Sequence, residues 1–427
     1  MREMKDSGIE WIGEIPCDWK LERSQWHLEE VNISNNPVQT NNVLSLTNKL
    51  GVVPYEEKGN QGNKSKENVY EYKLAYPNTI VANSMNILIG SVGLCDYFGC
   101  VSPVYYVFRA KKYNNIKFLN YVFQTVGFQR ELRKYANGIL EIRLRVSSSD
   151  ILKRFIPFPS EIEQQRIAEF LDRECGRIDG LKADIQAQID TLEQYKRSVI
   201  TEAVTHGLNP SAPMKDSGIP WVGEIPQNRV KAKIKNVASM IRSGTTPLSA
   251  VSEFFENGTI NWIQSGDIYG KKYINDVSMK ITELALASSS SLKIVRKPFI
   301  VMAMYGGSVG NTAISLIDAC TNQACCCIKP NDKTNFGFLY YWLLFCREDF
   351  LIKAEGGGQP NISQNKIRNE YIFIPPLDEQ QKIADYLDNK CAEIEQIIAD
   401  KKSQIETLDG YKKSLIFEYV TGKKEVV

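Results

Sequence analysis

The sequence predicts an α+β fold in which two β-rich domains are joined by two long antiparallel coiled-coil helices. Two observations lead to this fold class. The 427-residue chain is a tandem repeat of one unit, and each copy of the unit ends in a long segment with an apolar heptad pattern. A chain of this length is also too long for a single hydrophobic core, so several domains are expected.

The repeat extends through the whole chain. MKDSGIEWIGEIP begins at Met4 and recurs as MKDSGIPWVGEIP from Met214, with eleven of thirteen positions identical. EQQRIAEFLD and TLEQYKRSVI, which begin at Glu163 and Thr191, both recur 216 residues later as EQQKIADYLD and TLDGYKKSLI. Each unit is therefore a β-rich domain that ends in a Phe-Ile-Pro strand and continues into a helix. The expected boundaries are 1–160 and 207–376 for the domains, and 161–206 and 377–427 for the helices.

The two helical segments carry a coiled-coil pattern. The first has no proline from Glu161 to about Thr205, and Pro376 opens the second. Each helix of about 45 residues is roughly 65 Å long at 1.5 Å per residue, too long to bury its apolar stripe inside one domain. We therefore expect the helices to pack on each other. The expected seam is Ile167, Leu171, Ile178, Leu181, Ile185, Leu192, Tyr195 and Val199 in the first helix, and Ile383, Leu387, Ile394, Ile397, Leu408, Tyr411 and Leu415 in the second.

Gln188 and Gln404 are expected at the same seam position in the two helices, with Lys401 at another. A polar seam residue usually fixes the register of a coiled coil at a cost in stability. The alternative is that these sites are frayed or face a partner protein, and the sequence favours neither explanation.

The repeat also predicts where the chain ends lie. Duplicated units usually relate by a pseudo-two-fold axis, which makes the helices antiparallel and the arrangement circular. In the second unit the GEIP sequence follows directly on the helix that ends near Thr205. By the same relation, the GEIP of residues 13–16 should lie beside the end of the second helix near Thr421, with the two chain ends as neighbours.

Charge divides domains from helices. Residues 1–160 contain 20 basic and 16 acidic side chains, and residues 207–376 contain 18 and 13. The helical segments are acidic, with 6 basic against 10 acidic residues in 161–206 and 8 against 11 in 377–427. Basic domains on an acidic stalk are the pattern expected when the domains contact nucleic-acid phosphates. A solvated surface is the alternative explanation for so modest an excess.

Polar loops in the β-rich domains are the candidate DNA contacts, because Arg pairs bidentately with guanine and Asn or Gln with adenine. Any one of them can instead form a turn or contact a phosphate. The candidates of the first domain are Asn60, Gln61, Asn63, Lys64, Lys66, Ser84, Asn86, Arg143 and Arg145. Those of the second are Arg242, Ser243, Thr245, Gln264, Ser265, Tyr305, Asn311, Asn322, Gln323, Gln359 and Asn361.

The sequence lacks the motifs of a DNA-modifying enzyme. An adenine methyltransferase needs an N/D-P-P-Y/F loop, a cofactor turn needs G-x-G-x-x-G, and a Walker A loop needs lysine where Asn311 stands; none occurs. We therefore expect no catalytic, cofactor or metal site, an expectation that the presence of only two histidines supports. The ten cysteines are expected to be buried thiols. No apolar run reaches the roughly 18 residues of a membrane span, and the N-terminus has no signal-peptide core, so we expect a cytoplasmic protein.

The chain resembles the specificity subunit of type I restriction–modification enzymes over its full length. The resemblance rests on the two GEIP sequences, NWIQSGDI from Asn261, MYGGSVG from Met304, TNQ from Thr321 and GQPNIS from Gly358. The two proline-led EQQ-[KR]-IA helices are its most specific part. The first domain departs from the pattern, with Ser102-Pro103 near the place of Thr-Asn-Gln, which leaves its individual contacts open.

The resemblance implies that each domain is a target recognition domain that reads one half of a bipartite, asymmetric DNA site. It implies that the helices set the spacer between the half-sites and dock two modification subunits, which carry S-adenosylmethionine, and that two restriction subunits use ATP and magnesium to translocate DNA. Candidate contacts to the partner subunits are Trp11, Trp221, Gln165, Arg166, Gln381 and Lys382. The alternatives are a coiled-coil adaptor, the DNA-binding subunit of a related methyltransferase without a restriction partner, or a self-contained DNA-modifying enzyme.

Overall fold

The computed structural model describes residues 2–47, 51–58, 68–111, 114–137, 144–356 and 358–426. The chain forms two compact units. Unit 1 comprises Met1–Gln186 and Lys401–Val427, and unit 2 comprises Ala187–Asp400. Each unit thus holds one β-rich domain together with a part of both long helices.

Unit 1 is built around a four-stranded sheet in the order β4-β11-β8-β9, on which α1 packs. Its strands are β1 (Met4–Asp6), β2 (Glu14–Pro16), β3 (Lys20–Arg23), β4 (Leu28–Glu30), β5 (Leu44–Thr47), β6 (Gly51–Pro54), β7 (Lys73–Ala75), β8 (Thr79–Asn83), β9 (Val92–Cys95), β10 (Gly99–Val101), β11 (Tyr105–Ala110) and β12 (Phe155–Phe158). Its short helices are α1 (Ile116–Gln124), α2 (Val126–Arg133) and α3 (Ser148–Leu152).

Unit 2 repeats this plan around a five-stranded sheet in the order β16-β23-β20-β21-β18. Its strands are β13 (Met214–Asp216), β14 (Glu224–Pro226), β15 (Val230–Lys233), β16 (Ala238–Ser243), β17 (Ile260–Ile263), β18 (Tyr273–Ile274), β19 (Lys280–Ile281), β20 (Phe299–Ala303), β21 (Thr312–Ser315), β22 (Cys320–Thr321), β23 (Cys325–Pro330) and β24 (Tyr371–Ile374). Its short helices are α5 (Ile234–Val237), α6 (Ser265–Ile268), α7 (Glu283–Ala287), α8 (Phe336–Phe345), α9 (Arg347–Lys353) and α10 (Gln364–Asn369).

The repeated sequences form the same elements in both units. The two GEIP sequences close equivalent hairpins, β1–β2 and β13–β14, with Met4 opposite Pro16 and Met214 opposite Pro226. The strand that precedes each helix, β12 or β24, pairs antiparallel with β3 or β15. The predicted α+β class and the duplicated frame are therefore confirmed.

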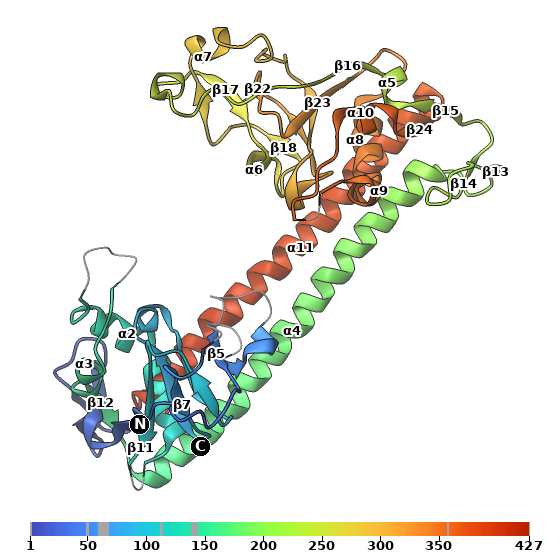
Figure 1. Ribbon diagram of the computed structural model, residues 1–427. Coiled ribbons are helices and arrows are strands. Elements are labelled where there is room, and N and C mark those ends of the chain that lie inside the picture. The colour runs from blue at the N-terminus through green and yellow to red at the C-terminus, as the bar shows by residue number, and fades with distance from the viewer. Residues whose placement is uncertain are drawn as a thin grey trace. The chain divides into compact units, whose positions relative to one another are not determined.

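The long helices are α4 (Glu161–Thr205) and α11 (Leu377–Val420), which match the predicted segments closely and pack together antiparallel (Figure 1). Cross-helix ion pairs fix their register within each unit. Lys412 Nζ lies 2.6 Å from Asp179 in unit 1, and Lys196 pairs with Glu395 in unit 2. The two pairs are equivalent in the repeat, because Lys412 lies 216 residues after Lys196 and Glu395 lies 216 residues after Asp179. Both units therefore use the same helix register.

The predicted seam is wrong at Leu181, Tyr195, Ile397 and Tyr411, which are 47%, 49%, 44% and 51% exposed. Cys175, Ile189, Cys391 and Ile398 are buried instead. The heptad of α4 therefore runs through Leu171, Cys175, Ile178, Lys182, Ile185, Ile189, Leu192, Lys196 and Val199. Lys182 and Lys196 make the heptad hard to recognise in the sequence, because they are charged residues at seam positions. Their aliphatic stems line the seam, while their ammonium groups pair with Asp409 and Glu395 on α11.

Gln188 and Gln404 are also exposed, so they do not occupy the seam, whereas Lys401 is partly buried at the position equivalent to Ile185. Both glutamines precede a seam residue by one position, at Ile189 and Ile405. The side chain of the preceding residue points about 100° away on a helix, which explains the difference.

The chain ends meet in unit 1, as the repeat predicts (Figure 1). Lys423 Nζ, just beyond α11, donates to the carbonyl oxygens of Ile12 at 2.6 Å and Glu14 at 3.0 Å. Gly422 has a φ of +70°, and a Cβ there would lie 2.4 Å from Pro16 Cδ, so the β1–β2 hairpin requires glycine at this helix end.

Each domain core includes both long helices. Ile167 and Leu171 of α4 join Leu415 and Val420 of α11 in the core of unit 1. Val199, Val204, Ile383 and Leu387 do the same in unit 2. The helices are therefore part of the folded domains, and the pseudo-two-fold relation between the units stays a prediction.

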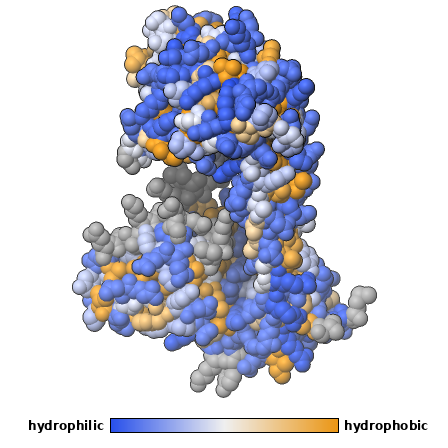
Figure 2. Space-filling view, turned by 90° about the vertical axis from the view of Figure 1, so that its right-hand side faces the viewer, coloured by the Kyte–Doolittle hydropathy of each residue, from blue (hydrophilic) through white to orange (hydrophobic). Residues whose placement is uncertain are grey.

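Nine of the ten cysteines are buried, as expected, and Cys17 is exposed. Burial raises the pKa of the Cys320 thiol to about 11 and that of Cys327 to about 12, so both stay protonated at neutral pH. Within the described ranges, no helix has an apolar stretch long enough to span a bilayer. The face in Figure 2 is mostly hydrophilic, with scattered hydrophobic residues.

Candidate nucleic-acid interface

Three loops of unit 2 that carry candidate DNA contacts lie together. They follow β16, follow β17 and precede β23. Thr246 Oγ1 donates to Gln323 Oε1 at 2.6 Å, and Asn322 N donates to the carbonyl of Ile263, next to Gln264. A Cβ on Gly244 would lie 1.8 Å from Thr321 O, so glycine is required where the first loop crosses the third. The structure thus joins the segments of Arg242–Thr245, Gln264–Ser265 and Asn322–Gln323.

A second set of candidates adjoins the first. The loop after β20 is hydrogen-bonded to the segment before β23 and to the segment before α10. Met304 N donates to Ala324 O at 2.8 Å, and Ile362 N donates to Met304 O at 2.9 Å. Tyr305 forms a bridge with Asn361, and its side chain is 39% exposed. Gln359 and Asn361 are exposed as well. Polar and aromatic side chains on neighbouring loops of one domain can serve base or phosphate contacts.

Unit 1 builds the corresponding region in the same way. Val146 N donates to Ser84 O at 3.1 Å, just as Ile362 N donates to Met304 O in unit 2. The bridge between Asn137 and Arg145 corresponds to that between Glu355 and Asn361. Asn86 and Arg145 are exposed on this region. The two domains therefore present different side chains on equivalent loops.

Some candidates have structural roles, and some lie outside the described residues. Ser84 is 4% exposed and holds the loop through its backbone, and Asn311 Oδ1 accepts from Arg347 Nε at 3.0 Å. Arg242 Nη2 donates to Ser291 O at 3.1 Å, and Ser243 Oγ is buried. The candidates outside the described residues are Asn60, Gln61, Asn63, Lys64, Lys66 and Arg143. DNA contact by any of the candidates stays a prediction.

The repeated EQQ sequence fastens each β-rich domain to a long helix. Gln164 Oε1 accepts from Asn115 N at 3.0 Å, and Gln380 Oε1 accepts from Asn335 N at 2.7 Å. The next glutamines, Gln165 and Gln381, accept from the side chains of the same asparagines. Asn115 and Asn335 cap α1 and α8.

The aspartate of the same repeated sequence makes a second connection to these helices. Tyr121 Oη donates to Asp172 at 2.8 Å, and Tyr341 Oη donates to Asp388 at 2.7 Å. Burial and these carboxylates raise the pKa of both tyrosines, so both remain donors. The repeated sequence therefore sets how α1 and α8 lie on the long helices.

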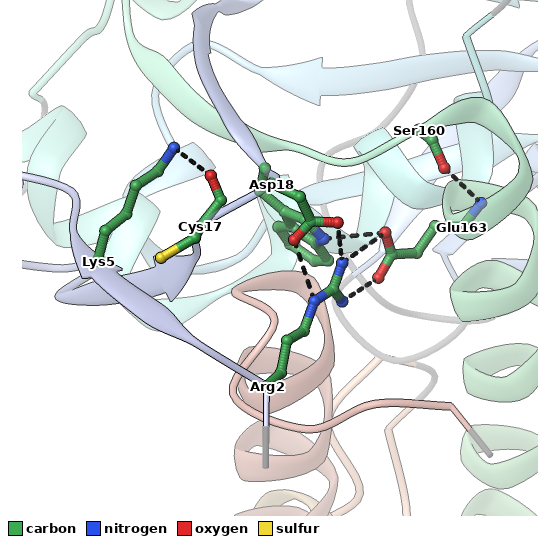
Figure 3. Close-up of polar contacts among 7 residues, drawn as sticks. Arg2, Lys5, Cys17, Asp18, Ser160 and Glu163 are labelled. Carbon is green, nitrogen blue, oxygen red and sulfur yellow. Dashed lines mark hydrogen bonds and ion pairs between the residues drawn. The ribbon is translucent and has the colours of Figure 1, made fainter.

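The glutamate of the EQQ sequence binds an arginine in both units, but the two arginines are not at equivalent positions of the repeat. In unit 1, Arg2 pairs with Glu163 and Asp18 (Figure 3). Trp19 Nε1 also donates to Glu163 Oε2, at 2.9 Å. The hydrogen bond to Glu163 is the main cause that raises the pKa of Arg2.

In unit 2, Arg229 stands three residues after Pro226, as Trp19 stands three after Pro16. Its side chain is fully buried, and Nη2 lies 3.3 Å from Glu379 Oε1. Nη1 donates to Val204 O at 2.8 Å, so Arg229 joins the end of α4 to the start of α11. Burial lowers the pKa of Arg229 to about 10, against the opposing effect of Glu379, and the guanidinium stays charged at neutral pH.

The two tryptophans proposed as partner contacts pack on their own domains. Trp11 meets Phe128 edge-on at 5.8 Å between ring centroids, and a Cβ on Gly127 would lie 2.8 Å from Trp11. Trp221 lies 5.0 Å from Phe345 and stays 36% exposed. Arg166 and Lys382 are exposed on the first turns of α4 and α11. Partner contact at these residues stays a prediction.

The four exposed residues from the predicted seam form a matching feature in both units, here called the apolar flank. It comprises Leu181 and Tyr411 in unit 1, and Tyr195 and Ile397 in unit 2. Each residue directly precedes a seam residue, which places it on one side of the helix pair, while Asp179 and Glu395 directly follow seam residues and lie on the other side. One aliphatic and one tyrosine side chain are thus exposed at the same place in each unit.

Several connecting residues escape prediction from the sequence. Arg2 and Arg229 are not equivalent positions in the repeat, so no alignment of the two copies relates them. A detectable signal existed for Glu163, Glu379, Asp172 and Asp388, because these acidic residues are identical in both copies although the surrounding helix surface is not. In the described part of the chain, no group of His, Cys, Asp and Glu side chains is placed to hold a metal ion.

Comparisons with known proteins agree with this architecture. Residues 226–407 match the family model of the type I restriction modification DNA specificity domain. The chain is 28% identical over 284 residues to the specificity subunit of the type I restriction enzyme MjaVIII from Methanocaldococcus jannaschii, across 64% of this chain and 62% of the relative. It is 24% identical over 301 residues to a protein assigned as the MjaX specificity subunit of the same organism, across 70% and 66%. The aligned part is somewhat less than two thirds of each relative's length.

Among solved structures, a chain from work on the complex assembly and conformational transition of the type I restriction–modification system has a TM-score of 0.70. It is 14% identical, and the match covers 96% of this chain and 99% of that chain. At this identity the similarity establishes the fold alone. In residues 226–407 the chain thus matches the type I restriction modification DNA specificity domain, and it is similar over a longer stretch to specificity subunits of type I restriction enzymes.

Proposed function

We propose that this chain is the non-catalytic DNA-recognition subunit of a type I restriction–modification complex, and that each β-rich domain reads one half of a bipartite, asymmetric site. The observation that carries this proposal is the pair of equivalent loop regions with unlike side chains. Tyr305 and Asn361 of unit 2 stand where unit 1 has Met85 and Arg145. A shared frame with different contact residues suits two unlike half-sites.

The net positive charge of the β-rich domains attracts the DNA phosphates, as DNA binding requires, whereas the net negative charge of the helices repels them. S-adenosylmethionine, ATP and magnesium then belong to partner subunits. Two modification subunits, and two restriction subunits where present, would complete the complex. A cytoplasmic location follows from this role as part of the proposal.

DNA binding by the complex of the full chain with its modification subunits tests the recognition role. Specific DNA should bind more tightly than random DNA by about three orders of magnitude or more at physiological salt. Exchanging residues 207–376 for the corresponding domain of a relative should change the preferred sequence of one half-site only. Binding that ignores sequence, or that survives the exchange unchanged, contradicts the proposal and favours an adaptor. Methylation by the chain alone would favour a self-contained enzyme.

The apolar flank is the proposed contact for the two modification subunits. Identical partners need one equivalent surface in each unit, and Leu181 with Tyr411 and Ile397 with Tyr195 provide it. Tyrosine is also among the residue types that contribute most at protein interfaces.

Replacing both Tyr195 and Tyr411 by alanine should weaken binding of the modification subunit by about 10- to 100-fold at each site. The single variants should each weaken one of two binding events, which calorimetry or sedimentation resolves. Tyr386→Ala is the matched control, because Tyr386 is also exposed on α11, at 41%. It precedes Leu387, whose next seam residue is four positions on, whereas Ile397 and Tyr411 precede seam residues whose next is three positions on, so Tyr386 points farther from the seam than the flank does. Equal losses for Tyr386→Ala, or none for the double variant, would remove the flank from the interface.

A further inference from the structure

Lys272 connects a loop of the second domain to a long helix. It stands between α6 and β18, and its Nζ lies 2.9 Å from Asp388 Oδ1 on α11 and 3.3 Å from Tyr341 Oη on α8. Its carbonyl oxygen accepts from Ile314 N at 2.8 Å, which fixes its backbone to β21. The side chain is 20% exposed and passes 5.4 Å from the Tyr341 ring centroid.

Lys272 belongs to residues 264–278, a segment that contains α6 and β18, is closed at its base by Asp267 and is here called the recognition loop. The buried carboxylate of Asp267 accepts from Gln264 N and from Ser278 N, both at 2.9 Å. Residues 264–278 are therefore tied together at their base. The loop carries two proposed DNA contacts, Gln264 and Ser265, and the 73% exposed Tyr269. Because Lys272 pairs with Asp388, it fixes the position of these residues relative to α11.

In the first domain, the aspartate that corresponds to Asp388 pairs with a lysine from a different element. Asp172, which corresponds to Asp388, pairs at 2.6 Å with Lys117, and Lys117 lies on α1 itself. The position corresponding to Lys117 in α8 is Gly337, where a Cβ would lie 2.9 Å from the Cβ of Ala384. No side chain fits there, so in unit 2 the cation comes from the recognition loop. The lysine of unit 1 holds only its own helix.

Lys272 is charged at neutral pH. Burial lowers its pKa, but the hydrogen bond and the charge of Asp388 outweigh burial, so its pKa lies above the usual value. Charge-assisted hydrogen bonds of this kind contribute more than neutral ones.

We propose that Lys272 is a positioning residue, which fixes the recognition loop of residues 264–278 against α11 and so narrows the range of spacer lengths that the second domain accepts. The inference rests on the proposed function of the chain as a reader of a bipartite site. It assigns to Lys272 no contact with DNA. Its effect acts on where the loop lies, and not on which bases the loop prefers.

Methylation by the full chain with its modification subunits tests the proposal, on DNA whose two half-sites are separated by spacers that vary in single base pairs. For Lys272→Ala, the ratio between the rate on the best spacer and on spacers one base pair longer or shorter should fall by about 3- to 10-fold, the size expected for the net contribution of one typical hydrogen bond. The rate on the best spacer and the base preference of both half-sites should stay unchanged. Lys272→Arg should restore most of the discrimination, and Lys117→Ala should keep the wild-type profile.

Hydrogen exchange of the chain alone gives a second readout that needs no DNA. Backbone amides in residues 264–278 should exchange about 10-fold faster in Lys272→Ala than in the wild type, with α11 unchanged. An unchanged spacer profile or unchanged exchange overturns the proposal, and an altered base preference would make Lys272 a DNA contact. A wild-type complex without site-specific methylation would defeat the proposed function, and the exchange experiment would still decide whether Lys272 holds the loop.

Discussion

Replacing Arg229 by alanine should destabilise unit 2 by about 3–5 kcal/mol, because the substitution leaves a cavity in place of a fully buried guanidinium and removes the cation of Glu379. It also leaves the carbonyl oxygen of Val204 without the donor that Arg229 Nη1 supplies at 2.8 Å. The guanidinium is fully buried where the end of α4 meets the start of α11. Denaturant unfolding, followed by hydrogen exchange of peptides from unit 2, measures the loss separately from unit 1.

Arg2→Ala is the matched control. Arg2 binds the equivalent Glu163, but its side chain is 23% exposed and Trp19 Nε1 also donates to that carboxylate. Its loss should cost about 1 kcal/mol or less. Arg229→Trp introduces the residue that unit 1 carries at this place and should recover part of the stability. Equal effects of Arg2→Ala and Arg229→Ala would show that burial does not set the energy of this contact.

Lengthening both helices by one heptad should lengthen the preferred spacer while both half-site sequences stay fixed. Seven residues inserted after Leu181 and seven after Asp409 preserve the seam, because these places face each other in the register set by Lys182 with Asp409. The insertion adds about 10 Å, or roughly three base-pair steps. Methylation of DNA with graded spacers measures the shift.

A shorter insertion makes a milder version of the same test. Four residues after Leu181 add about one turn, roughly 6 Å or near two base-pair steps, but they also change the phase of the seam and locally unwind it. The heptad inserted into α4 alone is the control and should impair assembly. If the half-site sequences change while the preferred spacer does not, the helices contact bases and do not set the distance.

The repeated framework of this protein could be predicted because its sequence occurs in two copies. The bounds of α4, the F-I-P strands and the meeting of the chain ends all follow from matches between the two copies. The seam was harder to predict, since Lys182, Lys196 and Cys175 occupy core positions where apolar residues are expected, and the apolar residues Leu181 and Tyr195 lie beside it.

The contacts that orient the domains could not be predicted, because the two units satisfy the same carboxylates from unrelated positions. Glu163 binds Arg2 and Glu379 binds Arg229, while Asp388 binds Lys272 from a loop that is distant in the sequence. Such compensation depends on where loops pass in space. The candidate DNA contacts share this limit, since their grouping on neighbouring loops follows from the fold and not from spacing.

The central claim is that the two domains read different half-sites at a distance fixed by the helices. Mapping the methylated adenines produced by the chain and its modification subunits on genomic DNA tests it most directly. The account predicts one bipartite site, with two unlike half-sites separated by a spacer of constant length. A continuous site, two identical half-sites or a spacer that varies freely would contradict it.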